Sequence, residues 1–494
     1  MSLEHFLEMA REYSADIALE DEQGSLSYRQ LMEKVEALAL WLSGQPVSVV
    51  GLIADNSRDW VLVDLASQMA GRVCLPIPAF FSEEQTRHCL TGVDLLISDQ
   101  QSVIETPVSA ESVSVPGTRL FAQRISQSDD QTCHGETALP DETQKITFTS
   151  GSTGTPKGVC LSLKHQWQVA QSLAEVIDVA KPRHLCLLPL ATLLENIAGI
   201  YVPLLCGGRI ILPDASQRGL SGSSGLNLRA LLACIEQHKP NTLILLPQLL
   251  QALVVACQQG WQPPESLTFM AVGGGKVAPS LIEQARRAGL PVYEGYGLSE
   301  CASVVALNTP GNDQPGSVGK CLPHCQVTVE DDEIVVRGAS FLGYMGQPES
   351  WNPQTVRTGD LGSIDGSWLT INGRKKNLLI SSFGRNISPE WVESAVLAMP
   401  LMSQCVVLGD GKPNLIALVS AVEAVSDEAI RDWIETVNTS LPDYARIKNW
   451  SRLETPVWQP YLTANGRPRR DLITKDFAGL IEALYSEHKT LNVN

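Results

Sequence analysis

Long apolar runs are missing from this 494-residue sequence. The longest, residues 197–208, contains Pro203 and stops at Arg209, whereas a helix needs about 20 apolar residues to span a bilayer. Residues 1–22 contain acidic side chains and no long apolar core, unlike a signal peptide. We therefore expect no transmembrane segment and no secretory leader.

Paired cysteines are missing as well. The twelve cysteines are scattered singly, with no Cys-x-x-Cys motif. Dispersed cysteines without a signal peptide are typical of reduced, mostly buried thiols, so we expect a cytoplasmic protein. Cys321 and Cys325 flank His324, but zinc usually takes four well-spaced ligands, and no second cluster accompanies them. We expect no zinc site there.

Positive charge is in deficit, with 37 Lys and Arg residues against 54 Asp and Glu residues and a net charge of −17. This balance argues against nucleic acid or an anionic membrane surface as the main partner. Any ATP site must therefore be locally basic within an acidic molecule. The composition, 44% hydrophobic, is that of a globular protein, and the length predicts two or three domains.

Strand and helix signals alternate through most of the sequence. Ser27 and Gln30 form a capping box that begins a helix ending at Gly44, and residues 47–53 form a continuous apolar strand. Strands separated by helices predict an α/β fold with parallel sheets covered on both faces. Further strands are expected at residues 73–77, 95–98, 185–190, 209–212, 243–246 and 267–272.

Other regions depart from this alternation. Residues 100–142 are polar and weakly patterned, which predicts a surface connection, and residues 219–227 predict a Gly/Ser loop without regular structure. Short alternating strands at residues 318–336 predict a small β subdomain. After Gly373 a basic run precedes a small α+β pattern. We therefore predict a large N-terminal domain, a hinge and a small mobile C-terminal domain, at residues 1–373, 374–376 and 377–494.

Residues 146–162, ITFTSGSTGTPKGVCLS, form the most informative stretch. Apolar residues at both ends predict a strand and its return partner. Between them, glycines turn backbone N–H groups inward, and hydroxyls and the Lys157 ammonium accompany them, a set that matches the oxygens of a polyphosphate. The spacing is not that of the P-loop. A plain hairpin loop would need neither Lys157 nor so many hydroxyls.

The segment TSGSTGTPKG resembles the phosphate loop of the adenylate-forming (AMP-binding) superfamily. That superfamily comprises the acyl-CoA synthetases, carrier-protein adenylation domains and luciferases. The resemblance implies that ATP is bound with Mg²⁺, and that Lys157 takes part in catalysis. It also implies that the triphosphate lies against Thr149, Ser150, Gly151, Ser152, Thr153 and Gly154.

A second match is EGYGLSE at residues 294–300, which resembles the YGxTE segment that lies against the nucleotide in the superfamily. The resemblance implies that Tyr296 packs on adenine, that Glu300 holds Mg²⁺, and that Ser299 hydrogen-bonds phosphate or the acyl carboxylate. An aromatic face, a hard oxygen and a hydroxyl suit these tasks. The segment would otherwise be a polar loop. The nucleotide would also lie against Glu294, Gly295 and Gly297.

Further matches follow in the expected order. Thr-Gly-Asp and Gly-Arg-Lys-Lys, ending at Asp360 and Lys376, resemble superfamily segments in which Asp360 and Arg374 would contact the ribose and Lys376 would be the hinge pivot. Without the resemblance they would be a turn and a solvated basic run. Gly384 lies in a segment resembling the loop that admits the pantetheine thiol of coenzyme A.

Residues 273–278, GGGKVA, have two interpretations. They fit the G-x-G-x-x-A fingerprint of an NAD-dependent oxidoreductase, with Glu294 about 20 residues further on. However, Pro279 suits the first turn of a helix, which would then begin beyond the glycines. The resemblance implies instead that Gly274 and Gly275 line the acyl pocket.

The C-terminal region contains one departure. Residues 463–470 fit the superfamily's Thr-x-x-Gly-Lys-x-x-Arg pattern, but Arg467 occupies the position of the catalytic lysine. That lysine bridges the carboxylate nucleophile and the phosphate, and arginine, although cationic, is planar and bulkier. Either the enzyme adenylates with Arg467, or it is slow in adenylation and suited to the thiol step.

The resemblance is strongest to long-chain fatty acyl-CoA synthetases, although Thr192 stands where many relatives carry His or an aromatic residue. It implies that a carboxylic acid, expected to be fatty acyl, is activated to acyl-AMP and transferred to coenzyme A. Apolar stretches at residues 197–205 and 243–256 would wall a tunnel or form simple core. An acyl carrier protein or an amine as acceptor, and a non-enzymatic AMP-binding regulator, remain alternatives.

Overall fold

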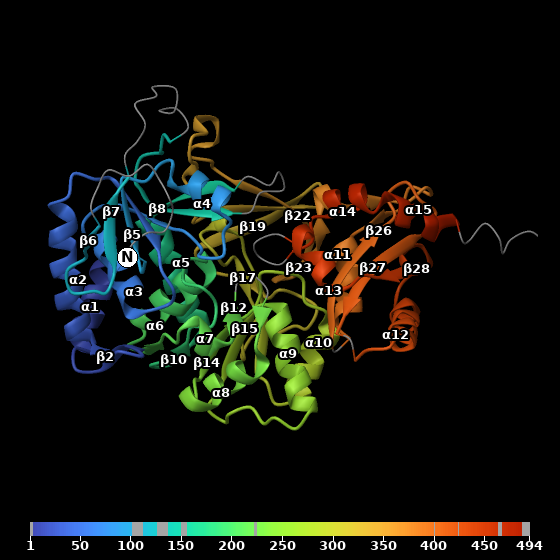
Figure 1. The fold of residues 1–494 in the computed structure, drawn as a ribbon, viewed down its shortest axis with the longest axis horizontal. Coiled ribbons are helices and arrows are strands. Elements are labelled where there is room, and N and C mark those ends of the chain that lie inside the picture. The colour runs from blue at the N-terminus through green and yellow to red at the C-terminus, as the bar shows by residue number, and fades with distance from the viewer. Residues whose placement is uncertain are drawn as a thin grey trace, which may run out of the picture.

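The computed structural model describes residues 3–100, 112–125, 137–149, 156–221, 225–399, 401–422, 424–462 and 467–486. A large α/β body, blue to yellow in Figure 1, adjoins a smaller α+β part formed by the C-terminal residues, orange to red. The predicted α/β fold class is confirmed. No helix in the described ranges is long and apolar enough to cross a membrane.

One sheet of the body has eight strands in the order β21-β9-β8-β4-β3-β5-β7-β6. Its centre, β8-β4-β3-β5, is parallel, and β9 returns antiparallel to β8 as predicted. The bounds are β3 (Val49–Ile53), β4 (Val73–Pro76), β5 (Leu95–Ser98), β6 (Val113–Ser114), β7 (Phe121–Arg124), β8 (Thr143–Thr149), β9 (Lys157–Ser162) and β21 (Gly343–Tyr344).

The other large sheet has thirteen strands, in the order β19-β20-β22-β23-β18-β17-β16-β15-β14-β10-β11-β1-β2. The run from β16 to β1 is parallel, and the strands on the β17 side are antiparallel. The bounds are β1 (Ile17–Asp21), β2 (Gly24–Ser27), β10 (Arg183–Leu185), β11 (Arg209–Ile211), β14 (Thr242–Leu245), β15 (Phe269–Val272), β16 (Val292–Tyr296), β17 (Ala306–Leu307), β18 (Lys320–Cys321), β19 (Cys325–Glu330), β20 (Glu333–Gly338), β22 (Val356–Asp365) and β23 (Trp368–Arg374).

Helices cover these sheets, and their ends follow local sequence signals. The capping box of Ser27 and Gln30 is present at the start of α2, which ends at Gly44. The helices of the body are α1 (Leu3–Glu12), α2 (Tyr28–Ser43), α3 (Arg58–Met69), α4 (Glu83–Leu90), α5 (Leu163–Ile177), the π-helix η2 (Glu195–Tyr201), α6 (Val202–Leu205), α7 (Ala215–Arg218), α8 (Leu228–His238), α9 (Pro247–Gln258) and α10 (Pro279–Arg287).

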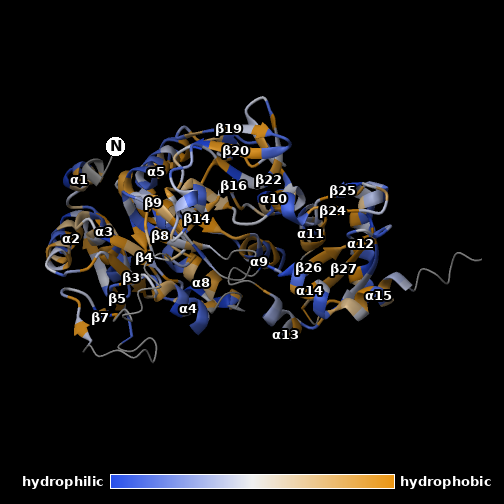
Figure 2. Cartoon of the chain, turned by 90° about the horizontal axis from the view of Figure 1, so that it is seen from above, coloured by the Kyte–Doolittle hydropathy of each residue, from blue (hydrophilic) through white to orange (hydrophobic). Residues whose placement is uncertain are grey.

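The C-terminal part contains a three-stranded sheet of order β26-β27-β28. Its strands β26 and β27 carry the hydrophobic colour in Figure 2, whereas helix α12 is mostly hydrophilic. The elements are β24 (Leu379–Ile380), β25 (Asn386–Ile387), α11 (Pro389–Leu397), β26 (Met402–Leu408), β27 (Leu415–Ala421), α12 (Asp427–Ser440), β28 (Ile447–Arg452), α13 (Thr455–Trp458), α14 (Arg470–Asp476) and α15 (Ala478–Ser486).

A buried ionic cluster anchors β8, the strand that leads into the predicted phosphate loop. The Lys145 ammonium lies 2.8 Å from the Asp64 carboxylate and donates to the Tyr201 hydroxyl at 2.7 Å. Tyr201 in turn donates to Asp64 at 2.6 Å, and its ring stacks on Trp167. Buried charges are tolerated when they are paired and hydrogen-bonded, so this cluster fixes β8 against α3 and η2.

Some predictions of secondary structure were wrong. The strand expected at 185–190 ends at Leu185, because the Asn56 side chain donates to Leu188 O and accepts from Leu190 N, each at 2.8 Å. A side chain therefore replaces the strand partner there. The connection at 100–142 contains β6 and β7, which extend the sheet from β5.

The predicted Gly/Ser loop also has regular structure on either side of its centre. β12 (Leu220–Ser221) pairs antiparallel with β13 (Gly225–Leu226). Gly219, which precedes β12, has a φ of +68° and caps helix α7. Gly219 thus ends a helix, and Gly225 lies opposite Ser221 in the paired strands.

Candidate active site

A cleft of about 2910 Å³ lies between the large body and the C-terminal part. Every predicted site residue that the structure describes lines it, except Gly384, which lies between β24 and β25 with a φ of +71°. The predicted residues on its wall are Thr149, Lys157, Gly274, Gly275, Glu294, Gly295, Tyr296, Gly297, Ser299, Glu300, Asp360, Arg374, Lys376 and Arg467.

The ends of the predicted phosphate loop are held together by the β8–β9 pairing. Thr149 is opposite Lys157 in the register, so the loop is closed at its base by backbone hydrogen bonds. Five of the predicted phosphate-binding residues lie outside the described ranges, and their roles stay predictions: Ser150, Gly151, Ser152, Thr153 and Gly154.

Tyr344 links two of the predicted catalytic side chains. The Lys157 ammonium lies 4.9 Å from the centre of the Tyr344 ring, and the Tyr344 hydroxyl donates to Glu300 Oε1 at 2.9 Å. Tyr344 reaches this position because β21 pairs with β9. Sequence reasoning missed Tyr344, which has no local motif. A carboxylate beside the phosphate loop suits Mg²⁺, which is typically held by one or two carboxylates and the phosphates of its substrate.

Asp360 is the centre of a second polar group. It accepts from the Tyr296 hydroxyl at 2.7 Å and from Arg374 Nε at 2.8 Å. The pairing of β22 with β23 places Asp360 opposite Arg374, so the segment expected by default to be a turn lies within a strand. Burial, and then the Asp360 carboxylate, raises the pKa of Tyr296. A buried carboxylate of this kind can accept hydrogen bonds from a sugar diol.

Glu294 and Lys276 form a third, buried group. Strand β16 runs through Tyr296, so Glu294 lies on a strand rather than in the polar loop expected without the resemblance. Burial raises the pKa of Glu294 to about 7, although Lys276 and the Val277 N–H oppose this. Burial lowers the pKa of Lys276, whose ammonium donates to the carbonyl of Ile371. Sequence reasoning did not assign Lys276 a place in the site.

The raised pKa of Glu294 gives a pH-dependent stability. Between pH 4.5 and about 7 the unfolded chain ionises Glu294 while the folded chain keeps it protonated, so this group lowers stability as pH rises. We expect Glu294→Gln to raise the unfolding free energy at pH 8 by up to about 3 kcal/mol, with the gain disappearing toward pH 4.5. Denaturant titrations at several pH values test this. A gain that grows on acidification would contradict it.

The glycine segment does not form a dinucleotide fold. Helix α10 begins at Pro279 with Ala278 as its N-cap, so its N-terminus lies beyond the glycines, as expected. Gly274 has a φ of +78°, and its carbonyl accepts a hydrogen bond from Arg467 Nη2. The C-terminal arginine therefore reaches the cleft beside the glycine pair.

The basic side chains of the cleft converge at the segment predicted to be the hinge. Lys376 lies in a 3₁₀ turn, η5 (Lys375–Asn377). Burial, followed by the charges of Arg374 and Arg467, lowers the pKa of Lys376. With Lys157 and Lys276, these cations are among eight Lys and Arg residues of the described ranges that line the cleft, against eight Asp and Glu residues. The cleft is therefore less acidic than the protein as a whole, but not basic as predicted.

Comparison with known proteins identifies the family. Residues 6–344 match the protein-family model for the AMP-binding enzyme, and residues 376–489 match the family model for the AMP-binding enzyme C-terminal domain. The chain belongs to the AMP-binding enzyme family. This confirms the resemblance to the adenylate-forming superfamily and gives no support to an NAD-dependent oxidoreductase.

Relatives in the family differ in substrate. A long-chain-fatty-acid–CoA ligase, FadD15, from Mycobacterium bovis is 27% identical over 83% of this chain and 80% of that protein. A 2-succinylbenzoate–CoA ligase from Bacillus velezensis is 30% identical over 56% of this chain and 57% of that protein. Among solved structures, the anthranilate CoA ligase AuaEII in complex with anthranoyl-AMP has a TM-score of 0.77 at 19% identity. The match covers 95% of this chain and 96% of that chain.

The cofactors expected from the sequence agree with the family match. ATP, Mg²⁺ and coenzyme A are those of adenylate-forming CoA ligases. One structural neighbour, an O-succinylbenzoate coenzyme A synthetase from Bacillus subtilis, is in complex with ATP and a magnesium ion, with a TM-score of 0.72 at 21% identity over 94% of this chain and 98% of that chain. The likeness of these structures concerns the fold.

Proposed function

We propose that the protein is an ATP-dependent fatty acid–CoA ligase that forms an acyl-adenylate and transfers the acyl group to coenzyme A. The observation that carries the proposal is that one cleft is lined both by polar side chains, with Asp360, Arg374, Glu300 and Lys157 (the polar wall), and by a set of apolar side chains (the apolar arm). The polar wall supplies groups for a nucleotide. The apolar arm supplies a binding surface for an acyl chain.

In this proposal the nucleotide lies along the polar wall. Asp360 accepts hydrogen bonds from the ribose hydroxyls. Arg374 holds the Asp360 carboxylate in place through the contact from its Nε. Lys157 and the residues of the β8–β9 connection bind the triphosphate by charge and hydrogen bonds. Glu300 would hold Mg²⁺, which neutralises phosphate charge when bound.

The chemistry has two steps. A carboxylate oxygen of the acid attacks the α-phosphorus of ATP, the bond to the bridging oxygen breaks, and pyrophosphate leaves. The thiol sulfur of coenzyme A, having lost its proton, then attacks the acyl carbon, and the bond to AMP breaks. Alignment and charge neutralisation supply most of the rate enhancement in the first step. Arg467, hydrogen-bonded to Gly274 beside the acyl pocket, would stabilise the charge that develops between carboxylate and phosphate.

The two steps need different groups at one cleft. We propose that residues 1–373 form one domain and residues 377–494 a mobile second domain, with residues 374–376 as the hinge and Lys376 as its pivot. Rotation would withdraw Arg467 and bring Gly384 and its neighbours toward the thiol. Gly384 has no atom within 4 Å of the position of an added Cβ, which leaves room for a close backbone approach.

The apolar arm favours a long neutral acyl chain. It is formed between α5, β10, η2, α6, β12, β13 and β14, and within the part of the chain that the structure describes no Lys or Arg of these elements lines the cleft. His184 of β10 also lines the cleft, but its Nε2 is paired with Glu195, so a second carboxylate on the substrate would have no Lys or Arg partner there. Apolar side chains of these elements line the arm: Leu173, Ala174, Ile177, Leu194, Ala198, Val202, Leu220, Leu226, Leu243 and Ile244.

A variant that narrows the arm tests the chain-length assignment. Ala271, on β15, lines the cleft and is the register partner of Ile244, a residue of the arm, so Ala271→Phe would narrow the arm beside β14. We expect kcat/KM for long-chain acids to fall by about tenfold or more while that for short acids falls less, because overpacking affects the longer occupant. An equal loss for all acids would contradict this placement of the chain.

Aromatic acids are the second candidate substrate class, favoured by the identity to the 2-succinylbenzoate–CoA ligase. An acyl carrier protein or an amine is the alternative acceptor. Product analysis after supplying coenzyme A, an acyl carrier protein or an amine with the same acyl-adenylate would identify the acceptor. We expect acyl-CoA. If an amide or an acylated carrier protein forms selectively instead, the amine or the carrier protein is the acceptor in place of coenzyme A.

A further inference from the structure

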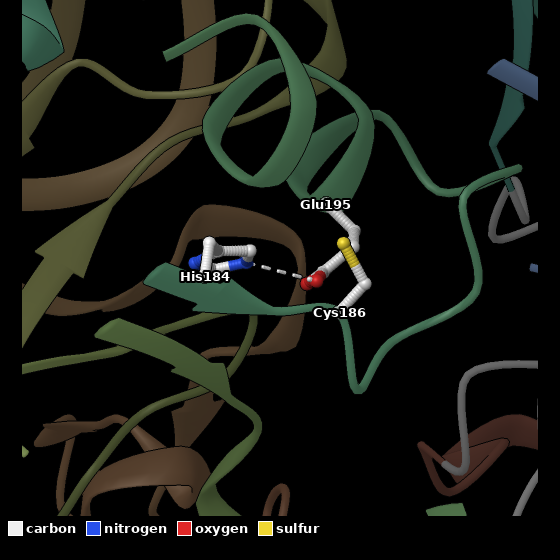
Figure 3. Close-up of side chains that lie close together, drawn as sticks. All are labelled: His184, Cys186 and Glu195. Atoms are coloured by element: carbon white, nitrogen blue, oxygen red, sulfur yellow. Dashed lines mark hydrogen bonds and ion pairs between the residues drawn. The ribbon is translucent and has the colours of Figure 1, made fainter. Parts of the chain in front are cut away.

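Three buried side chains that the proposed reaction does not use lie together at the wall of the apolar arm, where His184 also lines the cleft. Figure 3 shows His184 on β10, Cys186 just after that strand, and Glu195 at the start of η2, all pointing toward one another. One ligand atom from each lies within 4.8 Å of the others. Relative exposure is 2% for His184 and 0% for Glu195, and Cys186 is also buried.

Glu195 is not satisfied by its protein partners. Its Oε1 lies 3.2 Å from His184 Nε2, but its Oε2 is buried and without a hydrogen-bond partner among the described residues. A buried carboxylate oxygen without a partner costs free energy. Gly199 packs closely against the pair, since an added Cβ would lie 2.8 Å from His184 Nε2 and 3.0 Å from Glu195 Oε1.

Hydrogen bonds orient the His184 ring toward Glu195. His184 Nδ1 lies 3.0 Å from Thr242 Oγ1, which orients the ring and leaves Nε2 facing Glu195. Metal-bound histidines usually have such an oxygen partner on the other ring nitrogen. Glu195 begins a π-helix, and wide turns of this kind are frequent at functional sites.

We propose that His184 Nε2, Cys186 Sγ and a Glu195 oxygen bind one Zn²⁺ ion. Nitrogen, sulfur and oxygen donors suit this ion, and bonds of about 2.0–2.3 Å place tetrahedral ligands roughly 3.3–3.8 Å apart. Because the three atoms lie within 4.8 Å of one another, they need to approach by at most roughly 1.0–1.5 Å. The fourth position takes water. The ion would tie β10 to η2 and so stiffen the wall of the apolar arm.

Binding converts the Cys186 thiol, which contacts Gly199 O at 3.8 Å, to a thiolate and releases one proton. The affinity for Zn²⁺ therefore rises with pH. Co²⁺ is a suitable probe, because a thiolate ligand gives a sulfur-to-cobalt charge-transfer absorption. The site is independent of the adenylation chemistry, so its test does not require activity.

The experiment uses the full-length protein, treated with a chelator and titrated with Co²⁺ and Zn²⁺. We expect one equivalent of Zn²⁺, a raised Tm, and a charge-transfer band with Co²⁺. Cys186→Ser should remove the band, and Glu195→Gln, which keeps the thiol and the side-chain size, should weaken binding by about tenfold or more. Cys301→Ser is the matched control, because Cys301 is equally buried and lies outside the cluster.

Two results would overturn the proposal. One is the absence of a stoichiometric ion and of the thiolate band in the wild-type protein. The other is a band of equal intensity and affinity in Cys186→Ser and Glu195→Gln, which would place the ion on other thiols, such as those beside His324. If Cys186→Ser does not fold, the affinity of Glu195→Gln decides between the outcomes.

Discussion

Replacing Glu300 with Gln is expected to slow fatty-acid-dependent ATP–pyrophosphate exchange by about a hundred- to a thousandfold. The variant keeps the size of the side chain and its hydrogen bond from Tyr344, but it removes the negative charge that would hold Mg²⁺. Loss of a charge-stabilising contact at phosphate has this magnitude because the transition state carries more charge on its oxygens than the ground state. Exchange rates at saturating ATP and Mg²⁺ give the measurement.

Tyr344→Phe is the matched control for Glu300→Gln. It removes the hydroxyl that donates to Glu300 but keeps the carboxylate and the ring beside Lys157. Only a few-fold loss is expected. Full exchange activity in Glu300→Gln, or an equal loss in both variants, would mean that the Glu300 charge does not act in adenylation.

Removing the guanidinium in Arg467→Ala is expected to lower the rate of pyrophosphate release by about a hundred- to a thousandfold. Arg467 enters the cleft from the C-terminal part and donates to Gly274 O, beside the proposed acyl pocket. Its charge would act between carboxylate and phosphate in the first step. The reaction of preformed acyl-AMP with coenzyme A should change little, and stopped-flow assays of each half-reaction separate the two.

Arg467→Lys distinguishes the two interpretations of this position. If arginine makes adenylation slow, lysine should speed pyrophosphate release, and an unchanged or lower rate would discard that interpretation. Arg469→Ala, which removes a neighbouring cation that also lines the cleft, controls for the loss of local charge. A loss in Arg469→Ala as large as that in Arg467→Ala would show that general charge, rather than the position of Arg467, is responsible.

The parts of the site that could be predicted from the sequence are those encoded by short segments. The β8–β9 hairpin and the capping box at Ser27 depend on neighbouring residues, and both are present. Asp360 and Arg374 were predicted to act together only through the family resemblance. Their proximity comes from the β22–β23 register, which no local pattern specifies.

Other parts of the site depend on distant contacts. Tyr344 reaches Glu300 because a two-residue strand pairs with β9, and Lys276 meets Glu294 across the β15–β16 edge. The strand expected at residues 185–190 was interrupted by the Asn56 side chain, which lies far away in the sequence. Such nonlocal hydrogen bonds can end a strand that the apolar pattern predicts, because that pattern indicates which residues are buried but not which groups their backbone bonds to.

Magnesium-dependent ATP–pyrophosphate exchange by the wild-type protein, measured across acids of increasing chain length, tests the central claim most directly. The proposed function predicts saturable exchange that requires both Mg²⁺ and a fatty acid and that is highest for acids long enough to fill the apolar arm. Binding of AMP or ATP without exchange for any acid would contradict the claim, and would indicate a nucleotide-binding regulator instead.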